Sequence, residues 1–234
     1  MRFVVRLRSE TEADIPIDYR RRFISLLKYI FGNQEFERKE TRPYTFAVYF
    51  GKVKIEEEFI KGVSFINFRF STGNPIVASL FYNGILKLKK ENYNHSIGTG
   101  KFKVEKLDLE RQTELTGKFK TLSPVIVERI GYKNRKNPEE RYVVPGDDTF
   151  GESLIENTVR RYQALTGTYP RCSKFSLNPV WYKVEFIKHY GGYLKGFMGE
   201  FELDTDSRDM IEFVYKYGLG MRTGQGFGFL SALK

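Results

Sequence analysis

The chain has one cysteine, two histidines and one tryptophan among its 234 residues. The single cysteine, Cys172, excludes an internal disulfide and any paired-cysteine metal site. The two histidines, His95 and His189, lie far apart in the sequence, which argues against a structural zinc site. These scarcities predict a protein with no metal site and no cofactor.

Long apolar runs are also missing. No segment approaches the roughly 20 apolar residues that a membrane-spanning helix requires. The first seven residues, Met1-Arg2-Phe3-Val4-Val5-Arg6-Leu7, alternate cations with apolar side chains and lack the long apolar region of a signal peptide. We therefore expect a cytoplasmic protein.

Positive charge and aromatic side chains are abundant. Lysine and arginine total 39 against 29 acidic residues, for a net charge of +10 and a pI of about 9.5. Such a balance predicts a polyanionic partner, either nucleic acid or an anionic membrane surface. Hydrophobic residues at 41% and aromatic residues at 16% predict a folded chain with a real core.

Apolar periodicity predicts four strands in the first half, at 2–8, 43–50, 63–70 and 101–109. Helical spacing predicts a helix over 19–31 with Asp18 as its N-cap, and a shorter helix after Asn74. The acidic segment 9–14 is expected to be a turn. The resulting order, β-α-β-β-α-β, is the ferredoxin-like plan.

The second half repeats this order. Its expected elements are a strand at 118–127, a helix from Asp148 or Thr149 to Gly167, strands at 176–189 and 193–203, a helix from Ser207 and a last strand at 226–233. The turn between the paired strands is Tyr190-Gly191-Gly192, a hairpin signal. We predict an α+β protein with two tandem ferredoxin-like domains, residues 1–113 and 114–234.

Five glycines stand within eleven residues near the C-terminus, in the segment 218–228. Glycine costs conformational entropy on folding and buries no side chain, so such a cluster needs a reason. One reason is a chain that lies flat against a ligand, with its N–H groups pointing outward. The other is an ordinary glycine-rich hairpin that ends a domain.

The glycine segment also fits a known pattern: glycine–hydrophobic–glycine, five residues, then the same triplet again. This is similar to the signature of the RAMP superfamily, the RNA-binding proteins of CRISPR systems. The strings at 119–127, 1–7 and 157–162 resemble the CRISPR repeat-RNA processing endoribonucleases of that superfamily. The resemblance extends in order over essentially the whole chain.

The resemblance implies binding of the repeat segment of a CRISPR precursor transcript and its cleavage without metal. The ribose 2′-hydroxyl attacks the neighbouring phosphate and leaves a 2′,3′-cyclic phosphate and a 5′-hydroxyl. A non-catalytic repeat-RNA-binding subunit of a CRISPR effector complex is the alternative. A homodimer is a further partner that the resemblance leaves open.

The catalytic histidine that the family commonly carries is missing from its expected place. In the family, that histidine lies six residues before a cation that precedes the second strand. In this chain the cation is Arg42, and the residue six positions before it is Phe36. Proton transfer and stabilisation of the phosphorane then pass to other groups. The candidate catalytic residues are Lys28, Tyr29 and Arg42.

Two other answers stay open at this point. One of the remaining histidines could substitute, although His95 is expected at the end of the sheet opposite the C-terminal end of the first helix. His189, beside a hairpin turn, is expected to be an exposed polar tip. Alternatively, the protein binds repeat RNA without cutting it.

RNA-binding candidates follow from charge and from the glycine segment. Phosphate contacts by lysine and arginine dominate affinity for RNA, and unpaired bases stack on aromatic rings such as those of Tyr190 and Tyr193. The candidates are Arg20, Arg21, Arg22, Lys133, Arg135, Gly218, Gly220, Arg222, Gly226 and Gly228.

Overall fold

The computed structural model describes residues 1–32, 41–111, 113–132 and 137–234. Its helices are α1 (Arg20–Phe31), α3 (Pro75–Lys90), α4 (Pro138–Arg141), α5 (Phe150–Thr166) and α6 (Arg208–Tyr217), with a 3₁₀ turn η1 at Thr223–Gln225. None of the helices in these ranges is long and apolar enough to cross a membrane.

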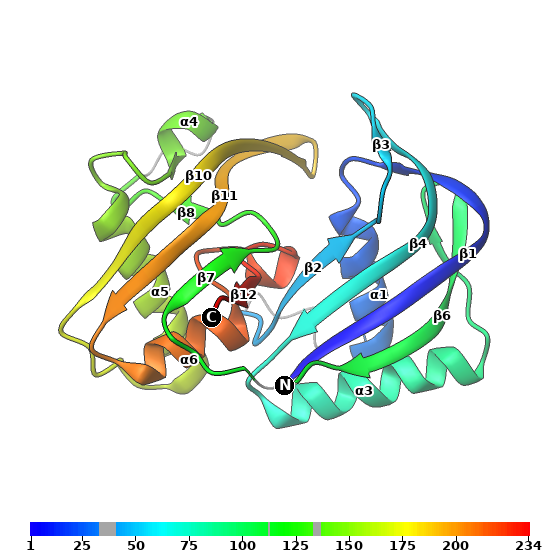
Figure 1. The fold of residues 1–234 in the computed structure, drawn as a ribbon, viewed down its shortest axis with the longest axis horizontal. Helices are drawn as coiled ribbons and strands as arrows, with labels where there is room; N and C mark the ends of the chain where they lie inside the picture. Colours follow the sequence, from blue (N-terminus) through cyan, green and yellow to red (C-terminus); the bar gives the residue numbers. More distant parts are fainter. Residues whose placement is uncertain (33–40, 112, 133–136) are drawn as a thin grey trace.

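The first sheet has the strand order β2-β4-β1-β6-β5, with antiparallel neighbours. Its strands are β1 (Arg2–Pro16), β2 (Thr45–Tyr49), β4 (Phe59–Ser71), β5 (His95–Ile97) and β6 (Gly100–Leu109), and the short β3 (Lys54–Ile55) pairs with β4. Helices α1 and α3 cover one face of this sheet (Figure 1).

Helix α3 shows how local sequence sets these elements. Asn74 caps it, with its side-chain oxygen accepting hydrogen bonds from the N–H groups of Ile76 and Val77 at 2.9 and 3.2 Å. Pro75 occupies the first turn, where no N–H is needed. The ring of Phe81 stacks on that of Phe70 in β4, with centroids 3.9 Å apart, and joins the helix to the sheet.

The segment 9–14 is not a turn, as the sequence suggested, but part of β1. The strand continues to Pro16 through register shifts between Arg8 and Ala13 and between Ala13 and Ile15. Ala13 and Ile15 are buried. Their burial on the sheet outweighs the strand-breaking tendency of the surrounding acidic residues.

The second sheet has the order β10-β11-β7-β12, again with antiparallel neighbours. Its strands are β7 (Lys118–Thr121), β10 (Phe175–His189), β11 (Gly192–Thr205) and β12 (Leu230–Ala232), and a separate two-stranded sheet joins β8 (Val127–Glu128) to β9 (Tyr142–Val143). Helices α5 and α6 pack against the larger sheet. The α+β class is confirmed, and both halves follow the β-α-β-β-α-β order.

Two strand predictions in the second half were too long. β7 ends at Thr121 because Pro124 follows and has no N–H for a ladder; Val125 and Ile126 make only isolated bridges. β12 begins at Leu230 because Gly226 and Gly228 hold positive φ angles of 88° and 68°, which interrupt an extended strand.

Two large buried clusters divide the chain. One runs from Phe3 to Val104 and the other from Phe119 to Leu230. We propose on this basis that 1–113 and 114–234 are the two domains. Figure 1 shows the two sheets side by side, with β12 and the chain leading into it between the lobes.

Buried side-chain hydrogen bonds lock the two halves together. The guanidinium of Arg2 in β1 donates to the carbonyls of Tyr215 and Leu230 at 3.0 and 2.7 Å. It lies between the rings of Tyr215 and Phe229, about 4 Å from each centroid. In β2, the Thr45 hydroxyl donates to the carbonyl of Phe227 at 2.9 Å.

Candidate nucleic-acid interface at the junction

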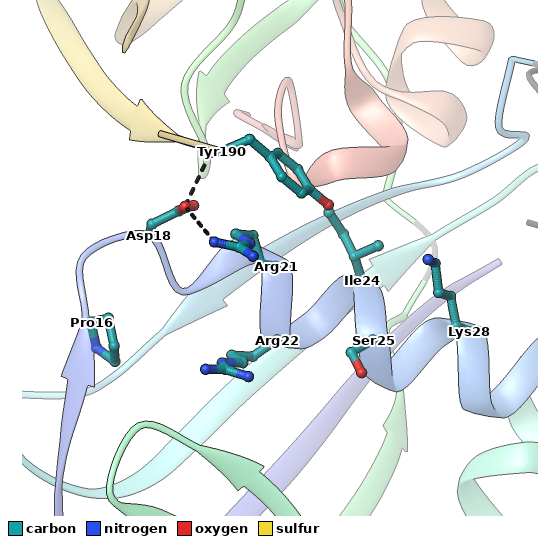
Figure 2. Close-up of a pocket in the computed structure, with 8 residues that line it drawn as sticks. All are labelled: Pro16, Asp18, Arg21, Arg22, Ile24, Ser25, Lys28 and Tyr190. Carbon is teal, nitrogen blue, oxygen red and sulfur yellow. Dashed lines mark hydrogen bonds and ion pairs between the residues drawn. The ribbon is translucent and has the colours of Figure 1, made fainter. Parts of the chain in front are cut away.

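A pocket of about 460 Å³ opens between α1 and the tip of the β10–β11 hairpin (Figure 2). Arg21, Ser25 and Lys28 follow each other at intervals of four and three residues, which places them on one face of α1. All three are exposed. The full lining is Pro16, Asp18, Arg21, Arg22, Ile24, Ser25, Lys28 and Tyr190.

Asp18 is not the N-cap of α1, contrary to the sequence prediction. Tyr19 takes that position, without a side-chain cap. The Asp18 carboxylate instead accepts a hydrogen bond from the backbone N–H of Tyr190 at 3.0 Å, and its Oδ2 lies 3.8 Å from the Arg21 guanidinium. Asp18, which precedes α1, thus holds the tip of the β10–β11 hairpin at Tyr190 (Figure 2).

Tyr190 forms the other wall of the pocket. It adopts a left-handed conformation with φ of 50°, followed by Gly191 at 77°, as a two-residue hairpin turn requires. Its ring is 55% exposed, and the Arg21 guanidinium lies 5.1 Å from the ring centroid. Desolvation by burial raises the pKa of the Tyr190 hydroxyl, so the group stays protonated at neutral pH.

His189 is buried, which shows that the expectation of an exposed tip was wrong. Its Nε2 lies 3.1 Å from the Gln225 side-chain oxygen, and its Nδ1 faces the Asp18 carboxylate at 3.3 Å. Gln225 also accepts a hydrogen bond from Arg222 at 3.3 Å. Burial lowers the pKa of His189, outweighing the nearby Asp18 charge. The ring therefore positions the hairpin tip.

His95 is also buried, and its Nε2 lies 2.8 Å from the backbone carbonyl of Arg22 in the first turn of α1. Desolvation lowers its pKa. Of the residues that the structure describes, those lining the pocket include neither histidine. Within the same ranges, no group of three or more His, Cys, Asp and Glu side chains is arranged to hold a metal ion.

A second hollow of about 290 Å³ shares Tyr190 with the first. Arg222 and Arg141 supply its positive charge, and Tyr193 is a second exposed aromatic. Arg222 has a left-handed φ of 59° and donates to the Tyr142 hydroxyl at 3.3 Å. The predicted RNA-binding residue Arg222 and the aromatic pair are thus brought together.

The glycines of 218–228 do not form an outward-facing surface. Gly218, Gly220, Gly226 and Gly228 are buried, each at a positive φ angle. A Cβ at Gly228 would lie 1.9 Å from the carbonyl oxygen of Leu219, and one at Gly226 would lie 2.5 Å from the ring of Phe46. The protein's own chain occupies the space beside them. Contact of these glycines with RNA stays a prediction.

Arg161 of α5 holds the glycine segment from the inside. Its buried guanidinium donates to the carbonyls of Tyr217, Gly218 and Gly220 at 2.8 to 3.0 Å and to the hydroxyl of Thr223 at 2.9 Å. Burial lowers the pKa of Arg161 to about 9, which leaves the group charged at neutral pH. The resemblance string 157–162 therefore contributes a structural cation.

Arg20 also needs a different role from the one predicted. It is buried, donates to the carbonyl of Gly226 at 3.2 Å, and lies 4.6 Å from the centroid of the Phe227 ring. Its guanidinium joins α1 to the glycine segment. Lys133 and Arg135 fall outside the described residues.

The three candidate catalytic residues are not gathered at one pocket. Lys28 lines the pocket on α1. Tyr29 is exposed and stacks on Tyr93, with centroids 4.6 Å apart. The aliphatic part of the Arg42 side chain packs against Gly224. A Cβ added at Gly224 would lie 2.6 Å from the Cβ and Cγ of Arg42. Neither Tyr29 nor Arg42 lines the pocket that Lys28 shares with Arg21 and Arg22.

The buried histidines predict a pH dependence of stability. Their pKa values are lowered from 6.5 by desolvation, so below about pH 6.5 the unfolded chain takes up protons before the folded one. The stability that the neutral rings confer is complete above that pH and is lost as pH falls through the lowered values. We expect the Tm to fall between pH 7 and pH 5 in thermal unfolding scans.

The variant His189→Gln is the comparison, because it keeps a polar side chain but removes the titration. Its Tm should fall less than that of the unchanged protein over the same interval, and His95→Gln should behave likewise. Parallel curves for all three proteins would contradict the assignment.

Two curated relatives are CRISPR-associated endoribonuclease-like proteins. A CRISPR-associated endoribonuclease-like protein of Pyrococcus horikoshii, Cas6nc, is 26% identical over 116 residues, which are 50% of this chain and 48% of the relative. A Cas6 counterpart from Pyrococcus furiosus is 25% identical over 116 residues, 50% and 47% of the two chains. The chain spans about half the length of the curated relatives it matches.

The fold is shared over the full chain. A structure from a study of a Cas6-related gene of Pyrococcus furiosus has a TM-score of 0.87 at 23% identity, covering 100% of this chain and 98% of that one. A structure described as a RAMP protein binding different RNA substrates has a TM-score of 0.85 at 22% identity, with both chains fully covered. A family model described as CRISPR associated protein Cas6, C-terminal, matches residues 105–232. This chain belongs to the CRISPR-associated Cas6 family.

Proposed function

We propose that the chain binds CRISPR repeat RNA at the junction pocket. The main support is a group of exposed cations on α1, namely Arg21, Arg22 and Lys28. They line a pocket of about 460 Å³ together with the half-exposed ring of Tyr190. Cations neutralise phosphates, and an aromatic ring beside them provides a surface for an unstacked base. The family of the chain supports repeat RNA as the ligand.

We further propose that this RNA is cleaved in the pocket without metal. The 2′-oxygen forms a bond to phosphorus, the bond to the 5′-oxygen breaks, and the products carry a 2′,3′-cyclic phosphate and a 5′-hydroxyl. The proton of the 2′-hydroxyl passes to solvent water, and a second proton is delivered to the leaving 5′-oxygen. In this proposal Lys28 supplies positive charge to the phosphorane and donates the second proton.

Binding without cleavage is the second candidate, and specific observations favour it. Both histidines are buried and hydrogen-bonded to other protein groups. The position six residues before Arg42 is Phe36, which lies outside the described residues. In this case the protein serves as a repeat-RNA-binding subunit of a CRISPR effector complex.

One assay distinguishes these candidates. Purified protein is incubated with repeat RNA in EDTA, and the products are analysed for cyclic phosphate ends. Cleavage products with such ends support the enzyme. RNA that is retained on the protein but stays whole over hours contradicts cleavage and leaves binding.

The binding site has a separate prediction. Arg21→Ala together with Arg22→Ala is expected to weaken RNA affinity by about tenfold or more and to reduce the salt dependence of binding by about two phosphate contacts. The measurement is a titration of labelled repeat RNA at several salt concentrations. Arg208→Ala on α6 is the control, because Arg208 is 83% exposed and does not line the pocket. Equal losses in both proteins would show that only total charge matters.

A further inference from the structure

Strand β10 forms the outer edge of the second sheet (Figure 1). It is 15 residues long, and no strand among the described residues pairs with its open side. Large apolar side chains are exposed along its middle, with Trp181 at 44% and Phe186 at 53%. A long apolar edge is a template for pairing with another chain, and folded proteins usually block such edges.

The backbone of this edge is free to pair. His189 and Gly192 flank the two-residue turn and form a hydrogen-bonded pair of the hairpin. Because the pattern alternates along an antiparallel ladder, the backbone groups of Tyr182, Val184 and Phe186 face the open side. A bulge between Pro179 and Trp181 limits the regular edge at one end. The buried His189 limits it at the other.

The segment between these limits is self-complementary. Its sequence is Trp181-Tyr182-Lys183-Val184-Glu185-Phe186-Ile187. When it runs antiparallel to a copy of itself about a two-fold axis at Val184, Lys183 lies opposite Glu185 and Tyr182 lies opposite Phe186. Opposite charges and aromatic pairs stabilise directly facing positions. At both ends of the segment, Trp181 of one copy then lies opposite Ile187 of the other.

Charge selects this register over its neighbours. A two-fold axis at Lys183 or at Glu185 would place that charge directly opposite its own copy, which is unfavourable. Within one chain, Lys183 and Glu185 already lie on the same face, with Nζ and Oε1 2.7 Å apart. Pairing at Val184 would join two such ion pairs into an alternating cluster of four charges.

We propose that β10 is a dimerisation edge, at which a second copy of this chain pairs antiparallel through residues 181–187. The contact joins the two second-half sheets into one continuous sheet of eight strands, because each contributes four. It also covers the exposed side chains Trp181, Tyr182, Val184 and Phe186. The proposal does not depend on the function of the junction pocket.

Charge reversal tests the register. In the proposed register, position 183 of each copy lies opposite position 185 of the other. Lys183→Glu therefore places two acidic residues opposite each other at both of these contacts, and Glu185→Lys places two lysines opposite each other. We expect each variant alone to weaken the dimer by about tenfold or more. The measurement is sedimentation velocity of the full chain over a range of concentrations, with circular dichroism to verify that each variant is folded.

The two variants are each other's control. Mixed in equal amounts, K183E and E185K restore opposite charges at both positions and should associate as a heterodimer, as should the double swap K183E/E185K with itself. A wild-type chain that stays monomeric at all concentrations would overturn the proposal. The proposal would also be overturned if the two variants failed to associate when mixed. The same holds if both substitutions weakened RNA binding without changing the sedimenting mass of the protein.

Discussion

Replacing Lys28 with alanine is expected to slow cleavage of repeat RNA by on the order of 100-fold, while affinity for the RNA falls by less than about tenfold. Lys28 is exposed and lines the junction pocket with Arg21 and Arg22. Its charge can stabilise the phosphorane, and its proton can pass to the leaving oxygen. The binding charge of the two arginines remains in the variant. Single-turnover cleavage and equilibrium binding of the same RNA measure the two effects.

Two further variants make this result specific. Lys87→Ala removes an exposed lysine from α3 that does not line the pocket, and it should leave cleavage unchanged. Lys28→Arg keeps the charge, so it should preserve activity if electrostatic stabilisation dominates and lose activity if proton transfer does. Equal losses of cleavage and binding in Lys28→Ala would make Lys28 a binding residue only.

Replacing Arg161 with methionine is expected to destabilise the protein by about 3–5 kcal/mol. Methionine fills part of the same volume but leaves the carbonyls of Tyr217, Gly218 and Gly220 without their donor. Each buried acceptor left unsatisfied costs about 1–3 kcal/mol. The midpoint of urea unfolding, followed by circular dichroism, measures the loss.

The neighbouring Arg160 provides a matched control on the same helix. It is 60% exposed and pairs with Glu156 one turn away, so Arg160→Met should cost less than about 1 kcal/mol. Similar losses for the two substitutions would contradict the view that Arg161 is the residue that holds the glycine segment.

Local chemistry made much of the fold predictable. Gly167 ends α5 in a left-handed conformation, and the turn at Tyr190 and Gly191 joins β10 to β11. The apolar positions of α1, from Phe23 to Leu27, are buried at helical spacing. In each case the signal lies within a few residues of the structure that it specifies.

The candidate site was less predictable, because its contacts connect distant parts of the chain. Asp18 precedes a helix and therefore resembles a cap, yet besides Arg21 it contacts residues at positions 189 and 190. Arg2, Arg20 and Arg161 can be buried because carbonyls from other segments accept their hydrogen bonds. No local pattern distinguishes such arginines from those that face solvent.

The glycine segment shows the same limit. Its spacing predicted either a chain that lies flat against a ligand or an ordinary glycine-rich hairpin. What lies against these glycines depends on how the rest of the chain folds around them. In this structure, Phe46 lies against Gly226 and Leu219 lies against Gly228. The family resemblance identified the segment without revealing which side of it is covered.

The bond between Arg2 and the carbonyl of Leu230 joins residues 228 positions apart. Together with the Thr45–Phe227 bond, it means that the first sheet can complete its contacts only after the last strand is in place. During synthesis, the wall built by α1 would emerge from the ribosome long before the hairpin tip and the glycine segment that support it. The pocket is therefore absent from any nascent chain that stops short of Tyr190, which forms its second wall.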